Sequence, residues 1–187
     1  PILWQFPAWY RFDHAVMEHF LSVLPRTASD AAKMAADNTI KKAGGAFVDL
    51  IADLPLRYAF EPRHESFFSE EFVSLLRTHN AALAIADTAG KFPFAEDVTA
   101  DFVYVRLHGS TELYASGYTD DELTTWARKI KAWSRGSEPR GLDKIVPGKF
   151  EPGVELDVYV YFDNDIHSHA PYDAMSLASK LRLSSPR

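Results

Sequence analysis

The sequence contains no cysteine among its 187 residues, which excludes disulfides, thiolate metal sites and a cysteine nucleophile. Long apolar runs are absent as well: none approaches the roughly 18 residues that a membrane-spanning helix needs. No basic segment followed by an apolar one opens the chain. We therefore expect a soluble, cytoplasmic protein with no membrane partner.

Neither sign of charge is in large excess. Lys and Arg number 20 against 26 Asp and Glu, which gives a net charge of −6. This mild acidity argues against a surface that coats nucleic acid broadly. Hydrophobic residues make up 47% and charged residues 25% of the chain, as in globular domains. The length predicts a single domain over residues 1–187 that can bury a core unaided.

Five short apolar segments alternate with segments whose apolar residues have helical spacing. The predicted strands cover about 2–6, 56–61, 81–86, 102–107 and 158–162, and the predicted helices about 13–24, 28–42, 69–80, 119–133 and 171–183. Residues 134–155 are rich in Pro and Gly and predict an irregular loop insertion. The first strand begins at Pro1 without an initiator Met, so we expect the chain to begin partway through a longer protein.

Short apolar strands that alternate with helices predict an α/β protein with a parallel sheet that is buried on both faces. Two architectures fit this order: a doubly wound open sheet or part of a (β/α)₈ barrel. No Gly-x-Gly-x-x-Gly motif follows any predicted strand, which weakens the dinucleotide-binding form of the open sheet.

Polar residues concentrate where four of the predicted strands end. They are Glu61-Pro62-Arg63-His64, Asp87-Thr88, Arg106-Leu107-His108-Gly109 and Asp163-Asn164-Asp165. The carboxyl ends of parallel strands meet at one rim, which is where such folds build their sites. Arg106 lies inside an apolar strand, where an unpaired guanidinium is very costly to bury. We therefore expect it to meet a carboxylate from a neighbouring strand, either Glu61 or Asp87.

These segments, in this order, resemble the YecE-like family, number 72 among the domains of unknown function. The resemblance covers about residues 1–183, and the ordered set is far more specific than any one of its members. The segments that carry it are Phe60-Glu61-Pro62-Arg63-His64, Ala86-Asp87-Thr88-Ala89, Tyr104-Val105-Arg106-Leu107-His108-Gly109, Trp126-Ala127 and Val158-Tyr159-Val160-Tyr161-Phe162-Asp163-Asn164-Asp165.

The resemblance implies an incomplete TIM-barrel-like fold, of which this chain would carry about five strands, equivalent to strands four to eight. Five strands cannot close a barrel, so the first and last would present unpaired edges. We expect the missing strands to come from the rest of the protein or from another copy. The family brings no established reaction with it.

The rim residues favour a pocket for a small anionic compound, phosphorylated or carboxylated. One hypothesis is that the protein is an enzyme acting on this compound. Arg63 and Arg106 would hold the anion. Glu61 or Asp87 would act as general acid or base, with His108 as a proton shuttle. The further ligand-binding candidates are Tyr114, Tyr118, Asn164 and Asp165.

Two alternatives stay open. One is a metal-dependent nucleic-acid-processing or nucleic-acid-binding protein, by analogy of fold with endonuclease IV-type barrels. The rim offers carboxylates and imidazoles that suit a divalent metal, namely Glu61, His64, Asp87, His108, Asp163, Asp165, His167 and His169, and basic residues gather at Lys129, Lys131, Arg135, Arg140, Lys144 and Lys149. The neighbouring arginines would compete with a cation, so we assign no metal ligand. The other alternative is a binding module without catalysis.

Overall fold

The structure, a computed structural model, describes residues 1–36, 48–148 and 154–183. It contains every predicted strand and helix. In chain order the elements are β1 (Ile2–Gln5), α1 (His14–Val23), α2 (Ala28–Ala36), β2 (Tyr58–Glu61), a short 3₁₀ helix (Glu65–Phe67), α3 (Glu70–Thr78), β3 (Ala82–Asp87), β4 (Phe102–Leu107), α4 (Asp120–Ser134), β5 (Asp157–Phe162) and α5 (His169–Leu181).

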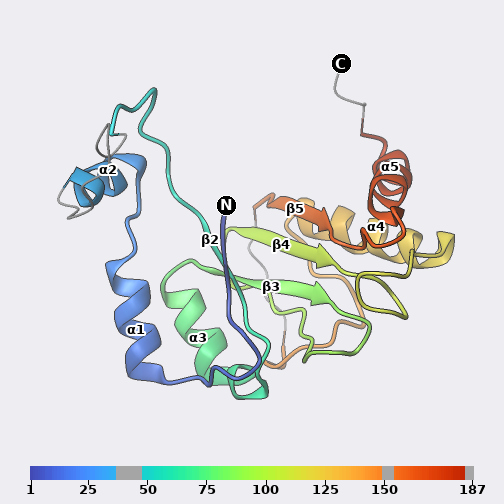
Figure 1. Cartoon of the computed structure of the whole chain (residues 1–187), viewed down its shortest axis with the longest axis horizontal. Coiled ribbons are helices and arrows are strands. Elements are labelled where there is room, and N and C mark those ends of the chain that lie inside the picture. Colours follow the sequence, from blue (N-terminus) through green and yellow to red (C-terminus); the bar gives the residue numbers. More distant parts are fainter. Residues whose placement is uncertain (37–47, 149–153, 184–187) are drawn as a thin grey trace.

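The five strands form one sheet in the order β1-β2-β3-β4-β5, and every neighbouring pair is parallel. Strand order therefore follows chain order, as in a barrel and unlike a doubly wound sheet, whose order reverses. The chain has an α/β fold in which a five-stranded parallel half-barrel is flanked by helices (Figure 1). The predicted fold class is confirmed, while the equivalence to strands four to eight stays a prediction.

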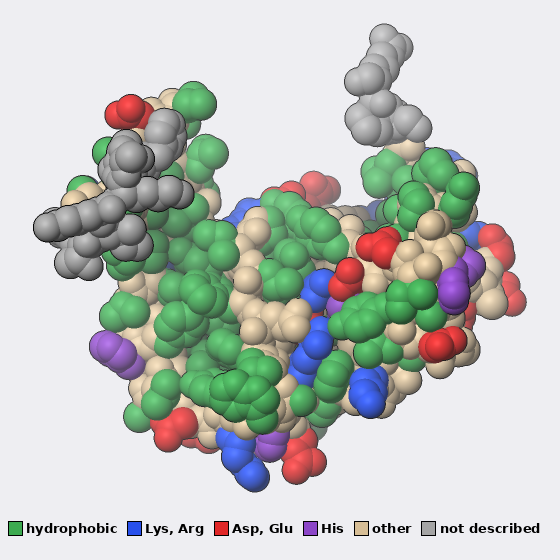
Figure 2. All heavy atoms as spheres, viewed as in Figure 1, with side chains coloured by type: hydrophobic (Ala, Val, Ile, Leu, Met, Phe, Trp, Pro, Cys, Tyr) green, Lys and Arg blue, Asp and Glu red, His purple; other side chains and the backbone are tan. Residues whose placement is uncertain are grey.

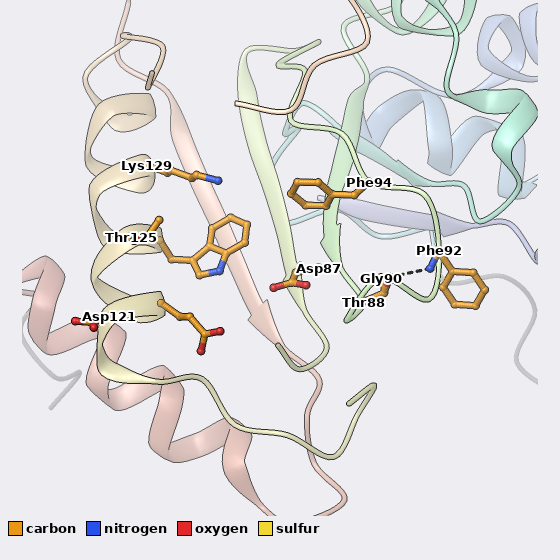
Figure 3. Close-up of a pocket in the computed structure, with 10 residues that line it drawn as sticks. Asp87, Thr88, Gly90, Phe92, Phe94, Asp121, Thr125 and Lys129 are labelled. Atoms are coloured by element: carbon orange, nitrogen blue, oxygen red, sulfur yellow. Dashed lines mark hydrogen bonds between the residues drawn. The ribbon is translucent and has the colours of Figure 1, made fainter. Parts of the chain in front are cut away.

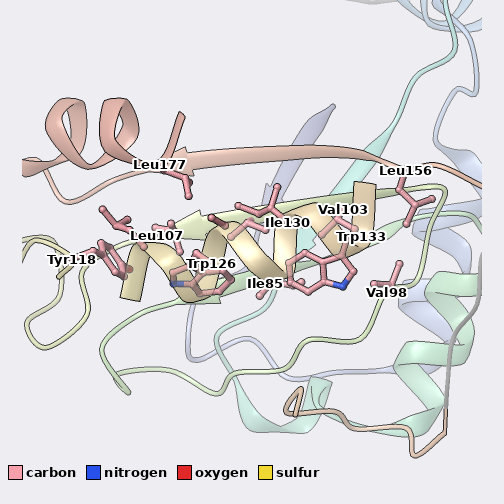
Figure 4. Packing of buried hydrophobic residues seen from close by; sticks show 13 residues of the cluster. Ile85, Val98, Val103, Leu107, Tyr118, Trp126, Ile130, Trp133, Leu156 and Leu177 are labelled. Atoms are coloured by element: carbon pink, nitrogen blue, oxygen red, sulfur yellow. The ribbon is translucent and has the colours of Figure 1, made fainter. Parts of the chain in front are cut away.

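Helices cover the outer face of this sheet. Helix α4 packs Trp126, Ile130 and Trp133 against side chains from β3 and β4, as Figure 4 shows. Helices α1 and α3 cover β2 and β3 in a second cluster around Phe60 and Phe67. Full burial of such side chains contributes roughly 1.5–3 kcal/mol each, so these clusters hold the helices to the sheet.

The inner face is built from small and aromatic side chains of the strands and of the segment before β4. Its cluster consists of Ala59, Ala82, Ala84, Ala100, Phe102 and Tyr104, with Leu3 and Tyr159 packed against it. None of these residues belongs to a helix. Because side chains alternate along a strand, Glu61 follows Ala59 onto this face, and Arg106 follows Tyr104.

Burial on both faces holds for β2, β3 and most of β4, but not for the two edge strands. Trp4 on β1 is 37% exposed and Tyr161 on β5 is 44% exposed. Within the described part of the chain, each of these strands pairs on one side only. The expectation of uniform burial was therefore wrong at the edges, whereas the expectation of two unpaired edges is met.

Local sequence signals explain where the helices begin. Asp13 caps α1, Ser69 caps α3, and Thr119 forms a reciprocal capping box with Glu122 at α4. Helix α5 begins at His169, two residues before the predicted start, because Pro is tolerated in the first turn. Of the predicted helix 28–42, Ala28–Ala36 is helical and the rest lies outside the described residues.

Strand β2 is shorter than the predicted segment 56–61. The backbone N–H of Leu56 donates to the carbonyl of Arg26, and Thr27 forms an isolated antiparallel bridge with Pro55. These contacts pair Pro55 and Leu56 with residues 26–27, while the carbonyl of Arg57 still accepts from the N–H of Ile2 on β1. In the described ranges, no helix has the length and apolarity to cross a membrane.

Candidate functional site

The ends of β2, β4 and β5 bring an arginine and two carboxylates together on the inner face. Arg106 donates from Nη1 to Oε2 of Glu61 and from Nη2 to Oδ2 of Asp163, both over 2.6 Å. Its Nη1 also lies 3.3 Å from Oε1 of Gln5, at the end of β1. Arg106 thus meets a carboxylate as expected, but Glu61 belongs to a strand two positions away, with β3 between them.

The alanines of β3 make this contact possible. Ala84 and Ala86 present only methyl groups to the inner face, and Ala86 is the register partner of Arg106. The Arg106 side chain can therefore pass over β3 to reach Glu61. A bulkier side chain at this position would stand between the two charges.

A second arginine shares the Glu61 carboxylate. Arg63 donates from Nε to Oε1 of Glu61 and from Nη2 to the hydroxyl of Tyr114, each over 3.1 Å. Its guanidinium also lies 4.6 Å from the centre of the Phe92 ring, a distance suited to a cation–π contact. These hydrogen bonds use Nε and Nη2, not Nη1.

The Glu61 side chain is only 2% exposed. It is ionised in spite of this burial. Burial by itself raises the pKa of Glu61, but His108 and Arg106 outweigh it and lower the pKa to about 2. The carboxylate is therefore a fixed negative charge that both arginines share.

His108 lies behind these groups and is completely buried. Its Nδ1 is 3.0 Å from Oδ2 of Asp163, and its Nε2 is 3.8 Å from Oε1 of Glu61. Neither ring nitrogen makes a well-aligned hydrogen bond. A buried polar group without a partner is costly and calls for an explanation, such as a water or ligand that completes it.

Tyr114 covers this imidazole. The two rings meet edge to face with centroids 5.2 Å apart, and the Tyr114 backbone has φ +64°. A non-glycine residue in the left-handed region stores strain, and such residues cluster at functional sites. Of the two tyrosines predicted to bind a ligand, Tyr114 is therefore the one that lies beside the arginine cluster.

Tyr118 and Asp87 lie on the other side of the sheet, with each other. The Tyr118 hydroxyl donates to Oδ2 of Asp87 and accepts from the backbone N–H of Gly109, both over 3.1 Å. Asp87 follows Ile85, whose side chain packs in the α4 cluster. Burial raises the pKa of Asp87. The structure thus brings Glu61, Arg63, Arg106 and His108 together and separates Asp87 from them.

The two candidates after β5 also differ in position. Asn164 is completely buried and donates from Nδ2 to the carbonyl of Ser116 and to Oδ2 of Asp173. It therefore ties the 109–118 loop to α5. Asp165 is exposed, and its carbonyl closes a turn with Ser168.

Asp163 was predicted from the sequence as a rim residue and a possible metal ligand, but not as a catalytic or anion-binding residue. Its side chain is 37% exposed, against 15% for Arg106 and 2% for Glu61, so it is the most accessible charge of the cluster. Strand alternation was the available signal: Tyr159 lies on the inner face, and Tyr161 and Asp163 follow it at two-residue steps.

Of the carboxylates and imidazoles considered for a metal, Glu61 and Asp163 lie beside His108, and Arg106 pairs with both acids. Among the described residues, no three His, Asp or Glu side chains form a group that could hold a metal ion. Arg106 occupies Glu61 and Asp163, the two acids nearest His108. The residues present at the rim do not fit a metal, and we assign none.

Three of the basic residues considered for nucleic acid have partners within the chain. Lys129 pairs with Glu96 and Lys144 with Glu138, while Lys131 donates to the carbonyl of Lys180. Trp126 and Trp133 are 7% and 1% exposed and belong to the core. Lys149 lies outside the described residues.

The arginine cluster is close to electrical balance, with two guanidinium groups against the carboxylates of Glu61 and Asp163. Glu61 is enclosed, whereas Asp163 is accessible. A ligand anion can therefore replace only the Asp163 contact without leaving a buried charge unpaired. Figure 2 shows basic side chains with acidic ones beside them in the middle of one face of the molecule, between larger apolar areas.

Comparison with known proteins shows one family. The model of the family "Protein of unknown function DUF72" matches residues 1–187. No curated protein matches the chain. A DUF72 family protein from Thermotoga maritima MSB8 (TM1631) has a similar structure, with a TM-score of 0.62 at 22% identity, over 96% of this chain and 56% of that one.

A DUF72 family protein from Enterococcus faecalis V583 (EF0366) is similar as well. Its TM-score is 0.62 at 15% identity, over 98% of this chain and 59% of that one. The chain thus spans less than two thirds of the length of these solved structures. Similarity at this level of identity shows that the fold is shared. The chemistry of the site has to be argued from the residues of this chain.

Proposed function

The chain belongs to the DUF72 family, and we propose that the arginine cluster at the ends of β2, β4 and β5 binds a small anionic compound, phosphorylated or carboxylated, as the substrate of an enzyme. The observation that carries this proposal is the double pairing of Arg106. One partner, Glu61, is enclosed and shared with Arg63, while the other, Asp163, is accessible.

An anion entering the site exchanges with Asp163. Planar guanidinium groups match the oxygens of phosphate and carboxylate in paired, charge-assisted hydrogen bonds. Arg106 can give its Nη2 to the ligand and keep Nη1 on Glu61. Arg63 can contribute Nη1, which its bonds to Glu61 and Tyr114 leave aside.

The displaced carboxylate then has a chemical role. Asp163 lies 3.0 Å from Nδ1 of His108, and a carboxylate beside an imidazole orients the ring and stabilises its protonated form. We assign proton transfer to Asp163, with His108 as the neighbouring group that exchanges a proton with it. Glu61, with its pKa near 2, stays ionised and acts as the fixed counter-charge.

The test is a titration of the protein with inorganic phosphate, followed through backbone amide chemical shifts. We expect saturable shifts at Gly109, Tyr114 and Asp163, with malonate as a carboxylate probe acting at the same amides. Sodium chloride at matched ionic strength is the control. Shifts that do not exceed those caused by chloride would overturn the proposal in favour of a structural ion-pair network.

A further inference from the structure

A second cavity lies on the helix side of the sheet, away from the arginine cluster. Figure 3 shows it between the connection that follows β3 and the first turns of α4. Its volume is about 540 Å³, within the range of small-molecule sites. The lining residues are Asp87, Thr88, Gly90, Phe92, Phe94, Asp121, Glu122, Thr125, Trp126 and Lys129.

Aromatic rings form opposite walls of this cavity. Phe94 projects from the 88–94 connection toward α4 (Figure 3), and Trp126 lines the cavity from the helix. Phe92 points away from them, toward the outside, where its ring meets Arg63. The space between Trp126 and Phe94 therefore suits an apolar group.

The charge of the lining is negative. Asp87, Asp121 and Glu122 contribute three carboxylates, and Lys129 is the one basic residue of the lining. The Lys129 ammonium is already paired with Glu96, which is buried and outside the cavity. No lining residue therefore offers a free positive charge to these three carboxylates.

Asp87 is the acid of the lining that is placed to receive a cation. Asp121 is exposed on the first turn of α4, and the half-buried Glu122 accepts hydrogen bonds from Thr119 in the capping box. The oxygens of Asp87 accept only from neutral donors, the Tyr118 hydroxyl and the backbone N–H of Ala89. Burial, with Glu122 nearby, raises the pKa of Asp87, as expected for a carboxylate that lacks a counter-charge.

The wall itself already holds one ammonium group. Nζ of Lys129 lies 4.9 Å from the centre of the Trp126 ring, within the range of a cation–π contact. A metal ion is a poorer occupant, because the described residues contain no group of three ligating side chains that could hold one. An organic cation uses both the rings and the carboxylate.

We propose that this cavity binds a small organic amine in its ammonium form, with its apolar body between Trp126 and Phe94 and its ammonium group on Asp87. The site is separate from the proposed anion site, and either can fail without the other. The amine needs no covalent chemistry, so the proposal concerns recognition alone.

The probe is 2-phenylethylamine, compared with 2-phenylethanol, which has the same apolar body and no charge. Binding is followed through the indole N–H signals, with the Trp126 signal identified by Trp126→Phe. We expect the amine to move this signal saturably and to bind about tenfold or more tightly than the alcohol, since a charged hydrogen bond adds about 1.5–3 kcal/mol. Equal affinity of the two compounds would overturn the proposal.

Variants separate the carboxylate from a general charge effect. Asp87→Asn should weaken amine binding about tenfold and leave the alcohol unchanged, and the exposed Asp49→Asn is the matched control with no effect. Thr125→Lys, on the exposed edge of the cavity, supplies a competing ammonium and should weaken the amine more than Thr125→Gln does. Should Asp87→Asn fail to fold, the test rests on Thr125→Lys and Thr125→Gln. Equal affinities of these two variants for the amine would contradict the proposal.

Discussion

Arg106 and Glu61 form a 2.6 Å ion pair across a strand that neither belongs to. They lie 45 positions apart in the sequence, and β3 passes between their strands with alanine methyl groups on the shared face. The pair joins β2 to β4 independently of the backbone ladder. Stability and the candidate anion site therefore depend on the same contact.

Replacing Glu61 with Gln should destabilise the protein and change its response to acid. The folded-state pKa, about 2, is lower than the ordinary value of 4.5. The unfolded chain therefore binds the proton first, and the contribution of Glu61 is complete above about pH 4.5 and lost as the pH falls toward 2. From this pKa difference we expect Glu61→Gln to lower the free energy of unfolding at pH 7 by about 3 kcal/mol, measured by urea unfolding.

The same experiment at lower pH contains its own check. The difference between the native protein and Glu61→Gln should shrink as the pH falls below 4.5. Asp165→Asn, at an exposed acid, should follow the native curve throughout. A difference that stays constant down to low pH would mean that Glu61 does not stabilise the fold as a charge.

Enlarging Ala86 should break the crossing contact without touching either charge. Ala86 is the register partner of Arg106, so a leucine there would occupy the space through which the arginine reaches Glu61. We expect Ala86→Leu to destabilise the protein by about 1–3 kcal/mol and to abolish the phosphate-induced shifts. Ala86→Ser, which is close in size, should keep both properties; loss of phosphate binding in the serine variant would refute the steric explanation.

Much of the fold follows from local sequence. All five strands and the caps Asp13, Ser69 and Thr119 were predictable, because apolar runs and capping residues act over a few positions. The exposure of the edge strands was not predictable from local sequence, because it depends on which strands pair with β1 and β5. The shortened start of β2 depends on backbone contacts with Arg26 and Thr27, about thirty residues earlier.

The site was predictable only in part. Sequence placed Glu61, Asp87 and Arg106 at one rim, but which face each side chain takes depends on strand alternation and on the register with the next strand. Asp87 follows the outward-facing Ile85 and so joins Tyr118 instead of Arg106. Asp163 is the first of three consecutive polar residues at the rim, and strand alternation is the signal that places it beside Arg106.

Removing the Tyr118 hydroxyl should leave a buried donor without a partner. This hydroxyl accepts from Gly109 N–H and donates to Asp87. We expect Tyr118→Phe to lower the free energy of unfolding by about 1–3 kcal/mol, measured by urea denaturation. Tyr172→Phe, at a side chain that is 66% exposed, should change it by less than about 0.5 kcal/mol. Equal effects would contradict the assigned hydrogen bonds.

Gly109 should tolerate no side chain. Its φ is +120°, and an added Cβ would collide with the carbonyl oxygen of Glu112. We expect Gly109→Ala to cost about 3 kcal/mol or more, from strain and overpacking together. Gly141 has φ +71° and open space around it, so Gly141→Ala should cost only about 1 kcal/mol. Thermal unfolding of the two variants compares them directly, and a tolerant Gly109 would mean that the 109–118 loop is not held as described.

The affinity for inorganic phosphate in Arg106→Lys tests the proposed function most directly. Lysine keeps the charge and the pairing with Glu61 but lacks the second donor arm that an anion would share. We predict that phosphate binding weakens about tenfold or more, while Arg128→Lys, on the exposed face of α4, binds as the native protein does. Unchanged affinity in Arg106→Lys, or an equal loss in Arg128→Lys, would contradict an anion site at Arg106.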